Sequence, residues 1–376
     1  MTVERFTKVT HQSWGQNILN SFIGAVLGVL LFFGSFVVLW TNEGKTDWSQ
    51  VARSSIAVDS SAVNPAHDGK FIAATGNLVS TEQLGDAPYL QPGSYLRLER
   101  KVEMFAWKEE QHSDTKKELG GGSTTTTTYD YSKVWTSNPQ DSSSFEYSQN
   151  HVNPPQRIQS AEHTVTSAHL GAYTLNTDQL EMPDGTPIAL NDSMISYDSK
   201  RPVVDNYLFI GSGTPDNPQL GDMRIQYLAV PNNANVTVFG TQQGSSIVAY
   251  LYRGDSSFFR ALSGDRATAI AQLHSEHVML TWILRLVGFL MMWIGMALTL
   301  GPITTFLDVL PILGNASGCV IGLATFGAAL TLSTVTVIIS LIAHSIIALI
   351  ILLALIVGGV VLWSRRAKGQ PVAATA

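Results

Sequence analysis

The sequence has almost no cysteine and, over long stretches, no charge. Cys319 is the single cysteine among 376 residues, so neither an intrachain disulfide nor a cysteine-based zinc site is available. Charged residues make up 14% of the chain, compared with about a quarter in a typical soluble domain. No Asp, Glu, Lys or Arg occurs between Leu313 and Trp363. These absences exclude a disulfide scaffold and indicate segments that lie in a membrane.

The charges that do occur are concentrated in the middle of the chain. Residues 42–277 hold 27 of the 29 acidic residues and 17 of the 23 basic ones, a net charge of −10. The other residues hold two acidic and six basic residues, a net charge of +4. Nucleic-acid binding needs a basic face. An acidic block therefore excludes nucleic acid as an expected partner.

Motifs for common enzyme chemistry are also missing from the sequence. It contains no G-x-S-x-G, no phosphate-cradling G-x-x-x-x-G-K, no H-E-x-x-H and no dinucleotide fingerprint. His274 and His277 share a helix face beside an apolar segment, but two imidazoles without a third ligand do not make a metal site. We therefore predict no catalytic residue, no cofactor and no metal, with catalysis by scattered residues as an alternative.

Four apolar segments are long enough to cross a bilayer. Residues 18–40 carry no charge, and residues 278–300 carry only Arg285. The run from Leu313 to Trp363 is too long for one helix, and its most polar pair, His344 and Ser345, predicts a turn at 341–345. A cleaved signal peptide is the alternative for the first segment, but its apolar core would be shorter.

Basic residues flank the outer ends of this set. Arg5 and Lys8 precede the first span, and Arg365, Arg366 and Lys368 follow the last. The positive-inside rule therefore places both ends in the cytosol and the acidic block on the other side. The predicted division is a cytosolic N-terminus (1–17), helix 1 (18–40), a non-cytosolic domain (41–277), helix 2 (278–300), a cytosolic interfacial loop (301–315), helix 3 (316–340), helix 4 (346–363) and a cytosolic tail (364–376).

The acidic block has the pattern of a β domain. From Leu96 to Ala106 the even positions are apolar except for Arg100, while the odd positions from Arg97 to Glu103 are charged. This alternation predicts a strand with one buried face. TYDYSKVW is its expected antiparallel partner, and KFIAATGNLV, DNYLFIG, DMRIQYLAV, NVTVFG and SIVAYLY are further candidate strands, whereas residues 138–200 show no clear pattern.

Two helical segments complete the expected fold. Residues 265–277 predict a helix that continues directly into the second span, and residues 303–310 predict a short helix at the cytosolic interface. The fold class is therefore an α+β membrane protein, with four transmembrane helices and a large β-rich extracytoplasmic domain inserted between helix 1 and helix 2.

Arg285 is the candidate functional residue of the spans, because a charge inside a membrane segment is costly. It either reaches the headgroups, pairs with another helix, or serves ion conduction with the hydroxyls of helix 3. Glycines recur every four residues at Gly24 and Gly28, and at Gly314, Gly318 and Gly322. Such stripes let helix backbones approach closely, either within one chain or between copies in a homo-oligomer.

The order of these segments resembles the LUMA family, also called the transmembrane protein 43 family. The resemblance rests on LWTNEGK, LERKVEMFAWKEE, NYLFIGSGTPDNPQLGDMRIQY, TWILRLVGFLMMWIGMAL and FLDVLPILG. It implies a four-span protein with a large non-cytosolic domain, which in animal cells resides in the endoplasmic reticulum and inner nuclear membrane and organises membrane-protein complexes. In a bacterium the corresponding compartment is the inner membrane.

The expected function is therefore that of a non-enzymatic multi-pass scaffold that organises membrane-protein complexes and envelope structure through its exposed β domain. Its expected partners are the lipid bilayer, other membrane proteins and further copies of itself. Two alternatives belong to other classes: an ion channel or channel subunit, and a membrane-tethered enzyme of unknown chemistry.

Overall fold

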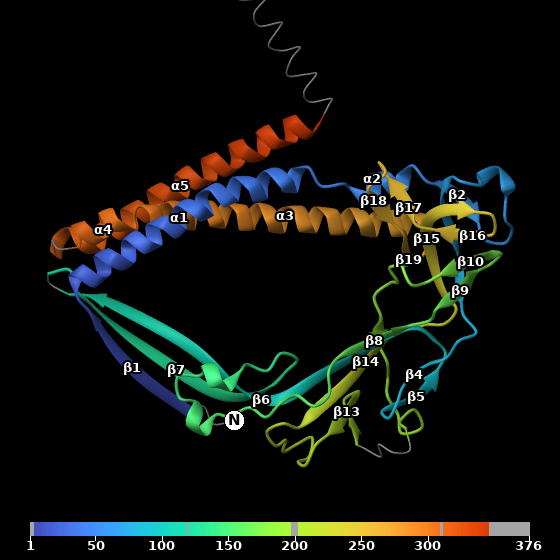
Figure 1. Ribbon diagram of the computed structural model, residues 1–376, viewed down its shortest axis with the longest axis horizontal. Helices are drawn as coiled ribbons and strands as arrows, with labels where there is room; N and C mark the ends of the chain where they lie inside the picture. The colour runs from blue at the N-terminus through green and yellow to red at the C-terminus, as the bar shows by residue number, and fades with distance from the viewer. Residues whose placement is uncertain (1–3, 119, 197–201, 309–310, 346–376) are drawn as a thin grey trace, which may run out of the picture. The chain divides into compact units, whose positions relative to one another are not determined.

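The computed structural model describes residues 4–118, 120–196, 202–308 and 311–345, without the side chains of residues 311–317. The chain forms two compact units, each built from separate stretches of sequence. Unit 1 comprises residues 1–8, 47–113 and 127–275, and unit 2 comprises residues 9–46, 114–126 and 276–376. Unit 1 contains most of the strands, whereas unit 2 contains the long apolar helices (Figure 1).

An eight-stranded sheet has the order β1-β7-β6-β14-β13-β12, with β11 beside β14 and β8 beside β6. Its strands are β1 (Glu4–Gln12), β6 (Tyr95–Lys117), β7 (Ser123–Thr136), β8 (Ala161–Thr164), β11 (Thr186–Pro187), β12 (Val203–Val204), β13 (Tyr207–Ile210) and β14 (Met223–Pro231). The predicted alternation in β6 is present from Leu96 to Met104: Leu98, Val102 and Met104 are fully buried, and Lys101 is exposed. It ends at Phe105, Ala106 and Trp107, all buried.

A seven-stranded sheet has the order β19-β15-β16-β10-β9-β3-β2, and β15 also pairs with β3. Its strands are β2 (Ile56–Asp59), β3 (Phe71–Val79), β9 (Ser167–Leu170), β10 (Tyr173–Asn176), β15 (Ala234–Gln243), β16 (Ser246–Val248) and β19 (Arg260–Ser263). The extra pairing closes β3, β9, β10, β16 and β15 into a ring. Among the described residues, two short antiparallel pairs remain: β4 (Leu84–Asp86) with β5 (Leu90–Gly93), and β17 (Tyr250–Tyr252) with β18 (Ser256–Phe258).

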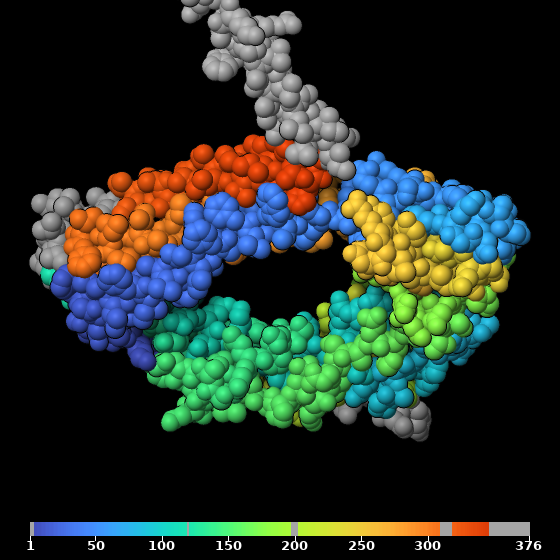
Figure 2. Space-filling view, turned by 45° about the horizontal axis from the view of Figure 1, so that its top comes forward, coloured from blue at the N-terminus to red at the C-terminus, as the bar shows by residue number. Residues whose placement is uncertain are grey.

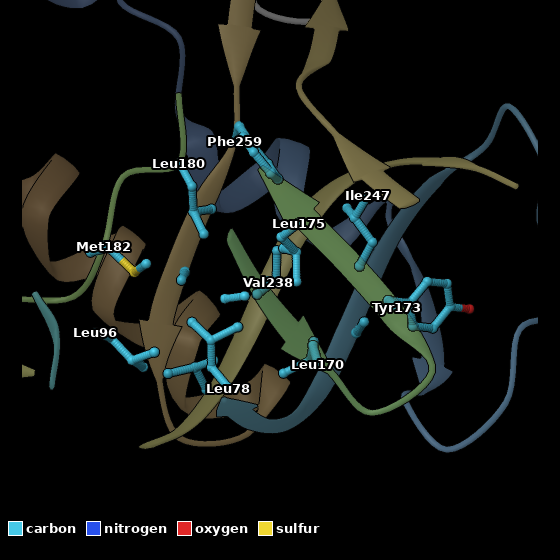
Figure 3. Close-up of a cluster of buried hydrophobic side chains, with 14 of the residues drawn as sticks. Leu78, Leu96, Leu170, Tyr173, Leu175, Leu180, Met182, Val238, Ile247 and Phe259 are labelled. Atoms are coloured by element: carbon cyan, nitrogen blue, oxygen red, sulfur yellow. The ribbon is translucent and has the colours of Figure 1, made fainter. Parts of the chain in front are cut away.

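The two faces of β3 and β15 are buried against different partners. Ile72 and Val238 belong to the large apolar cluster that Figure 3 shows, together with Leu170, Tyr173 and Leu175. The alternate residues of the same strands point to the other face, where helix residues of α2 (Trp48–Arg53) and the start of α3 cover them. Side chains alternate across a strand, so a strand buried on both faces needs apolar residues at nearly every position.

Unit 2 contains α1 (Trp14–Glu43), most of α3 (Arg266–Thr299), α4 (Gly301–Leu307) and α5 (Pro311–His344). α1 begins with a capping box in which the Ser13 hydroxyl accepts from Gln16 N, an arrangement that satisfies amide groups at a helix start. α5 lies along α1 (Figure 2). Within the described residues, three helices are long and apolar enough to cross a membrane, in Trp14–Arg53, Arg266–Thr299 and Gly318–His344.

These helices carry large apolar side chains on their outer faces. Leu30 of α1 is 65% exposed, Trp282 of α3 63% and Leu323 of α5 69%. Contiguous apolar surface of this kind is more stable in contact with lipid than with water. The three helices are therefore candidate membrane segments, and they coincide with three of the four predicted spans.

The helix bounds differ in detail from the predicted ones. α1 extends beyond the predicted 18–40 at both ends, and α5 begins at Pro311 inside the predicted loop 301–315. The loop is itself mostly helical, as α4. α5 ends at His344, within the predicted turn. The predicted fourth span (346–363) and the cytosolic tail (364–376) lie outside the described residues.

Candidate functional site in the helical unit

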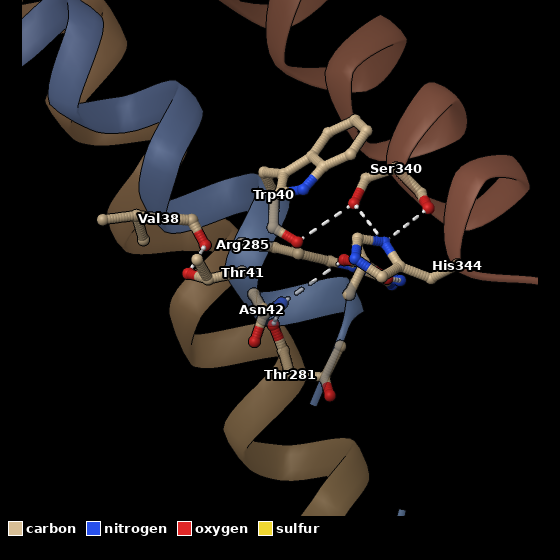
Figure 4. A network of polar contacts seen from close by, with 9 residues as sticks. Val38, Trp40, Thr41, Asn42, Thr281, Arg285, Ser340 and His344 are labelled. Carbon is tan, nitrogen blue, oxygen red and sulfur yellow. Dashed lines mark hydrogen bonds and ion pairs between the residues drawn. The ribbon is translucent and has the colours of Figure 1, made fainter. Parts of the chain in front are cut away.

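Polar side chains of three helices meet near the end of α1 (Figure 4). Asn42 and Glu43 are the last residues of α1, Arg285 lies on α3, and Ser340 and His344 lie near the end of α5. Polar groups within apolar helices are costly unless they find partners. The contacts of these five residues show which partners they have found.

Arg285 is held by a carboxylate of the neighbouring helix. Its Nε and Nη2 donate to the two carboxylate oxygens of Glu43 at 2.8 Å each. The Glu43 side chain is only 3% exposed, and that of Arg285 is 23% exposed. The guanidinium also lies 5.0 Å from the ring centre of Trp282. This planar two-bond pairing is specific to arginine. In the structure Arg285 therefore pairs with another helix, the second of the three roles expected for it.

Asn42 and Ser340 add hydrogen bonds on either side of this ion pair. Asn42 Nδ2 donates to the Thr281 carbonyl at 3.1 Å, which ties α1 to α3. Ser340 Oγ donates to the Trp40 carbonyl at 3.1 Å, which ties α5 to α1. The His344 ring lies 5.1 Å from that of Trp40. The network therefore joins all three helices near one end of α1.

Glycine makes the close approach of α1 and α3 possible. A Cβ added to Gly28 would lie 2.6 Å from the Gly295 carbonyl oxygen, and one added to Gly295 would lie 2.7 Å from Phe32 N. Gly24 is less crowded, with Leu298 at 3.9 Å. Such backbone contact is the usual basis of helix association in lipid. Gly28 therefore packs within the chain.

The glycines of α5 behave differently. A Cβ on Gly318 or Gly322 would meet no atom within 4 Å among the described residues. Gly322 contributes only its carbonyl, which accepts from Trp293 Nε1 at 3.1 Å. The side-chain surroundings of Gly314 lie outside the described residues. A side chain at Gly318 or Gly322 would therefore meet no described atom, although Trp293 of α3 reaches the Gly322 carbonyl.

In the ion-channel alternative, the hydroxyls of α5 would line an ion path together with Arg285. Instead, Thr331, Thr334 and Thr336 donate to carbonyls four residues earlier in the same helix, at 2.7 to 2.9 Å. Ser333 similarly donates to the Leu330 carbonyl. Ser340 alone of this group bonds to another helix. A hydroxyl that bonds its own helix needs no polar neighbour.

A second cluster in unit 2 surrounds the tip of the β6–β7 hairpin. Asn17 Nδ2 donates to the Gly121 carbonyl at 3.0 Å, and Lys117 Nζ lies 2.6 Å from Asp308 Oδ1. A Cβ on Gly121, whose φ is +84°, would lie 2.3 Å from the Trp14 ring. The tip therefore contacts the start of α1 and the end of α4.

This contact bears on the predicted sidedness, which stays a prediction. The charge rule places residues 114–126 on the non-cytosolic side, and residues 1–17 and 301–315 in the cytosol. The structure pairs β1 with β7 and joins Lys117 to Asp308. The rule counts charges near the spans and contains no term for strand pairing between distant segments, so it could not anticipate this cluster.

Unit 1 contains a buried polar centre that the sequence did not reveal. The Asp86 side chain is 5% exposed and accepts from Arg100 Nη1 at 2.7 Å and from the Tyr227 hydroxyl. Burial raises the pKa of Tyr227 well above its usual range, and the bond to Asp86 raises it further. Arg100 interrupts the apolar positions of β6 because it is neutralised there. That interruption was the only signal in the sequence.

The remaining ionisable candidates form no joint site. No group of three or more His, Cys, Asp or Glu side chains suited to a metal occurs among the described residues, so His274 and His277 gain no third ligand. Asp308 pairs with Lys117, and the His344 Nδ1 atom lies 2.9 Å from the Ser340 carbonyl. The residues that sequence reasoning missed are the partners, chiefly Glu43 and Asp86.

Comparison with known proteins decides the family. The family model described as transmembrane protein 43 matches residues 104–346. The chain belongs to the transmembrane protein 43 family. It is 24% identical to transmembrane protein 43 of Mus musculus over 84% of this chain and 82% of the mouse protein. It is 25% identical to the Homo sapiens protein over the same shares.

The Drosophila melanogaster protein named as a transmembrane protein 43 homolog is 25% identical over 72% of this chain and 75% of its own length. No solved structure matches the chain. Membership in the transmembrane protein 43 family and the three apolar helices agree that this is an integral membrane protein.

Proposed function

We propose that the protein is a non-enzymatic multi-pass scaffold that organises membrane-protein complexes and envelope structure through its β-rich unit. The observation that carries this proposal is the Arg285–Glu43 pair. The charge inside the second span is used to lock two helices together, and Gly28 packs α1 against α3 by backbone contact. Helices held together in this way would fix the β-rich unit, most of which lies between α1 and α3 in the sequence, to the membrane.

The same observations give little support to the channel reading. A channel needs polar groups that face a path for ions. Arg285 is occupied by Glu43, and most hydroxyls of α5 bond their own helix. We place the protein in the bacterial inner membrane, or in the endoplasmic reticulum and inner nuclear membrane if the source is a eukaryote.

Self-association forms part of the proposal. Gly318 is exposed on α5, and a Cβ at Gly318 or Gly322 would meet no described atom. Small residues at this spacing suit helix contact between copies. We propose that copies of the chain associate through these glycines. The expected partners are therefore the bilayer, further copies and other membrane proteins, without nucleic acid.

Cross-linking in intact membranes tests the scaffold. A lysine-reactive cross-linker should join lysines of unit 1, such as Lys101 and Lys108, to a reproducible set of membrane proteins. Removing the protein should then shift those same proteins to smaller complexes on native gels. Unchanged complexes would refute the scaffold.

Conductance of purified protein in liposomes tests the alternative. The scaffold reading predicts no current above that of empty liposomes. A selective current that disappears in Arg285→Leu, in a variant that still folds, would establish the channel instead.

A further inference from the structure

Unit 1 carries a groove that none of the contacts described so far uses. Its larger hollow has a volume of about 870 Å³ and is lined by Pro88 and Tyr89, by the segment 154–158, and by the two ends of the loop between β13 and β14. A smaller hollow of about 290 Å³ is lined by Asn138–Ser142 and also by Pro154 and Pro155. The two prolines therefore line both hollows, which adjoin each other there.

One wall of the groove is held rigid by a buried carboxylate. Asp222 is 2% exposed and accepts from the backbone amides of Ser212 at 2.9 Å, Gly213 at 3.1 Å and Gln219 at 2.7 Å. A Cβ on Gly211 would lie 2.1 Å from the Asp222 carboxylate, so this wrapping requires glycine. The wall is thus formed on folding, which lowers the ordering cost of binding a ligand.

The opposite wall is fixed to strand β6. The Asn153 side chain accepts from Trp107 N at 2.7 Å and donates to the Trp107 carbonyl at 2.9 Å. Pro154 follows directly and packs on Gly221, where a Cβ would lie 2.7 Å from its Cγ. Gly221 has φ of +85°, a conformation that favours glycine. Both walls are therefore preformed.

Arg157 supplies an unused positive charge on this lining. Its side chain is exposed, and it has no hydrogen bond or ion pair within the part of the chain that the structure describes. The other charged lining residue, Asp222, is buried and satisfied by three amides. Tyr89, Ile158 and Ile210 line the same hollow as Arg157 and provide apolar surface there. This combination suits a ligand with an apolar face and a carboxylate.

Two features limit the class of ligand. Residues 42–277 carry a net charge of −10, so a polyacidic ligand is repelled at long range, and one carboxylate is favoured over many. The two hollows share Pro154 and Pro155 in their lining, so an elongated ligand can occupy both. Arginine pairs a single carboxylate through two parallel bonds.

We propose that this groove binds an extended peptide segment of a partner protein, with one peptide carboxylate paired to Arg157. The inference rests on the proposed scaffold function, because it assigns a docking site to that scaffold. Apolar side chains of the peptide lie on Tyr89 and the prolines, and polar ones lie in the hollow around Asn138 and Gln140.

Selection from random dodecapeptides displayed on phage tests the proposal, with the full-length protein in nanodiscs as the target. Enriched sequences are synthesised with a fluorescent label, and their affinity is measured by anisotropy. We expect enriched peptides that carry Asp or Glu beside apolar residues. Changing that residue to Asn or Gln, or introducing Arg157→Ala, should weaken binding about tenfold or more, because a charge-assisted bond is lost.

Arg53→Ala is the matched control, since Arg53 is an exposed arginine of unit 1 that does not line the groove. It should leave the affinity unchanged. Equal weakening by Arg53→Ala and Arg157→Ala would show unspecific attraction and overturn the proposal. So would selected peptides whose binding ignores Arg157, or a selection that enriches nothing.

Different results would refute the proposed groove and the proposed scaffold function. A groove that binds no peptide, together with cross-linked complexes that depend on the protein, removes this docking site and keeps the scaffold. Peptides that bind the groove through Arg157, together with complexes that do not change when the protein is removed, keep the site and remove the scaffold.

Discussion

Breaking the ion pair between α1 and α3 should destabilise the helical unit strongly. Arg285→Leu leaves the Glu43 carboxylate, only 3% exposed, without its counter-charge. Removing one partner of a buried pair costs about 3–5 kcal/mol. Arg285→Lys should lie between Arg285→Leu and the wild type, because an ammonium cannot donate to both oxygens in the planar geometry that the guanidinium adopts.

The double variant Arg285→Leu/Glu43→Leu separates pairing from the mere presence of arginine. Replacing both charges with apolar side chains is neutral or stabilising by about 1–4 kcal/mol in comparable cases, so the second substitution should rescue the first. Unfolding is followed by circular dichroism in mixed detergent micelles, and the free energies of the four proteins form a double-mutant cycle. Additive losses would mean that the two residues are not coupled, and that Arg285 reaches the headgroups instead.

The remaining predictions concern helix packing, the sheet and sidedness. Gly28→Leu should prevent folding because its added atoms meet α3 backbone, whereas the same change at Gly318 should leave a folded monomer and dissociate any oligomer on size-exclusion chromatography. Val102→Asp should make unit 1 sensitive to protease because it buries an unpaired carboxylate, whereas Lys101→Asp should be mild; equal sensitivity would refute the alternation in β6. With Cys319 replaced by Ala, a cysteine at the exposed Thr115 and one in β1 should react alike with an impermeant thiol reagent in sealed vesicles, because the hairpin tip contacts residues near the start of α1. Reaction at Thr115 alone would support the orientation from the charge rule.

The hydrophobic pattern along the sequence predicted the strands and helices whose burial depends on their own residues. The strand through Val102 was visible as alternation, because it buries one face along its own length. The span within α3 was visible as an apolar run long enough to cross a bilayer. The alternation ended at Phe105, where an aromatic cluster containing Trp107 and Tyr131 buries the other face as well. The periodicity of a strand cannot show that distant residues will bury its second face.

Long-range partners were the part that sequence could not supply. From the sequence, Glu43 is only a polar residue after the first span. Its partner Arg285 lies on α3, more than 240 positions later in the chain. Residues 138–200 lack a period because side-chain bonds such as those of Asn153 order their loops. β1 was missed because its pairing with β7 connects segments far apart in the chain. These features depend on which segments meet, and a single sequence does not encode that visibly.

The closed ring of five strands has a consequence for how the protein is made. Leu78 of β3 pairs with Ala234 of β15, a separation of 156 residues. At about 5–20 residues per second, translation leaves β3 waiting roughly 8–30 s for its partner. During that interval the strand exposes Ile72, Ala74 and Leu78, which are all fully buried after folding. The nascent chain therefore needs protection from aggregation after its first helix has entered the membrane and before its central domain can close.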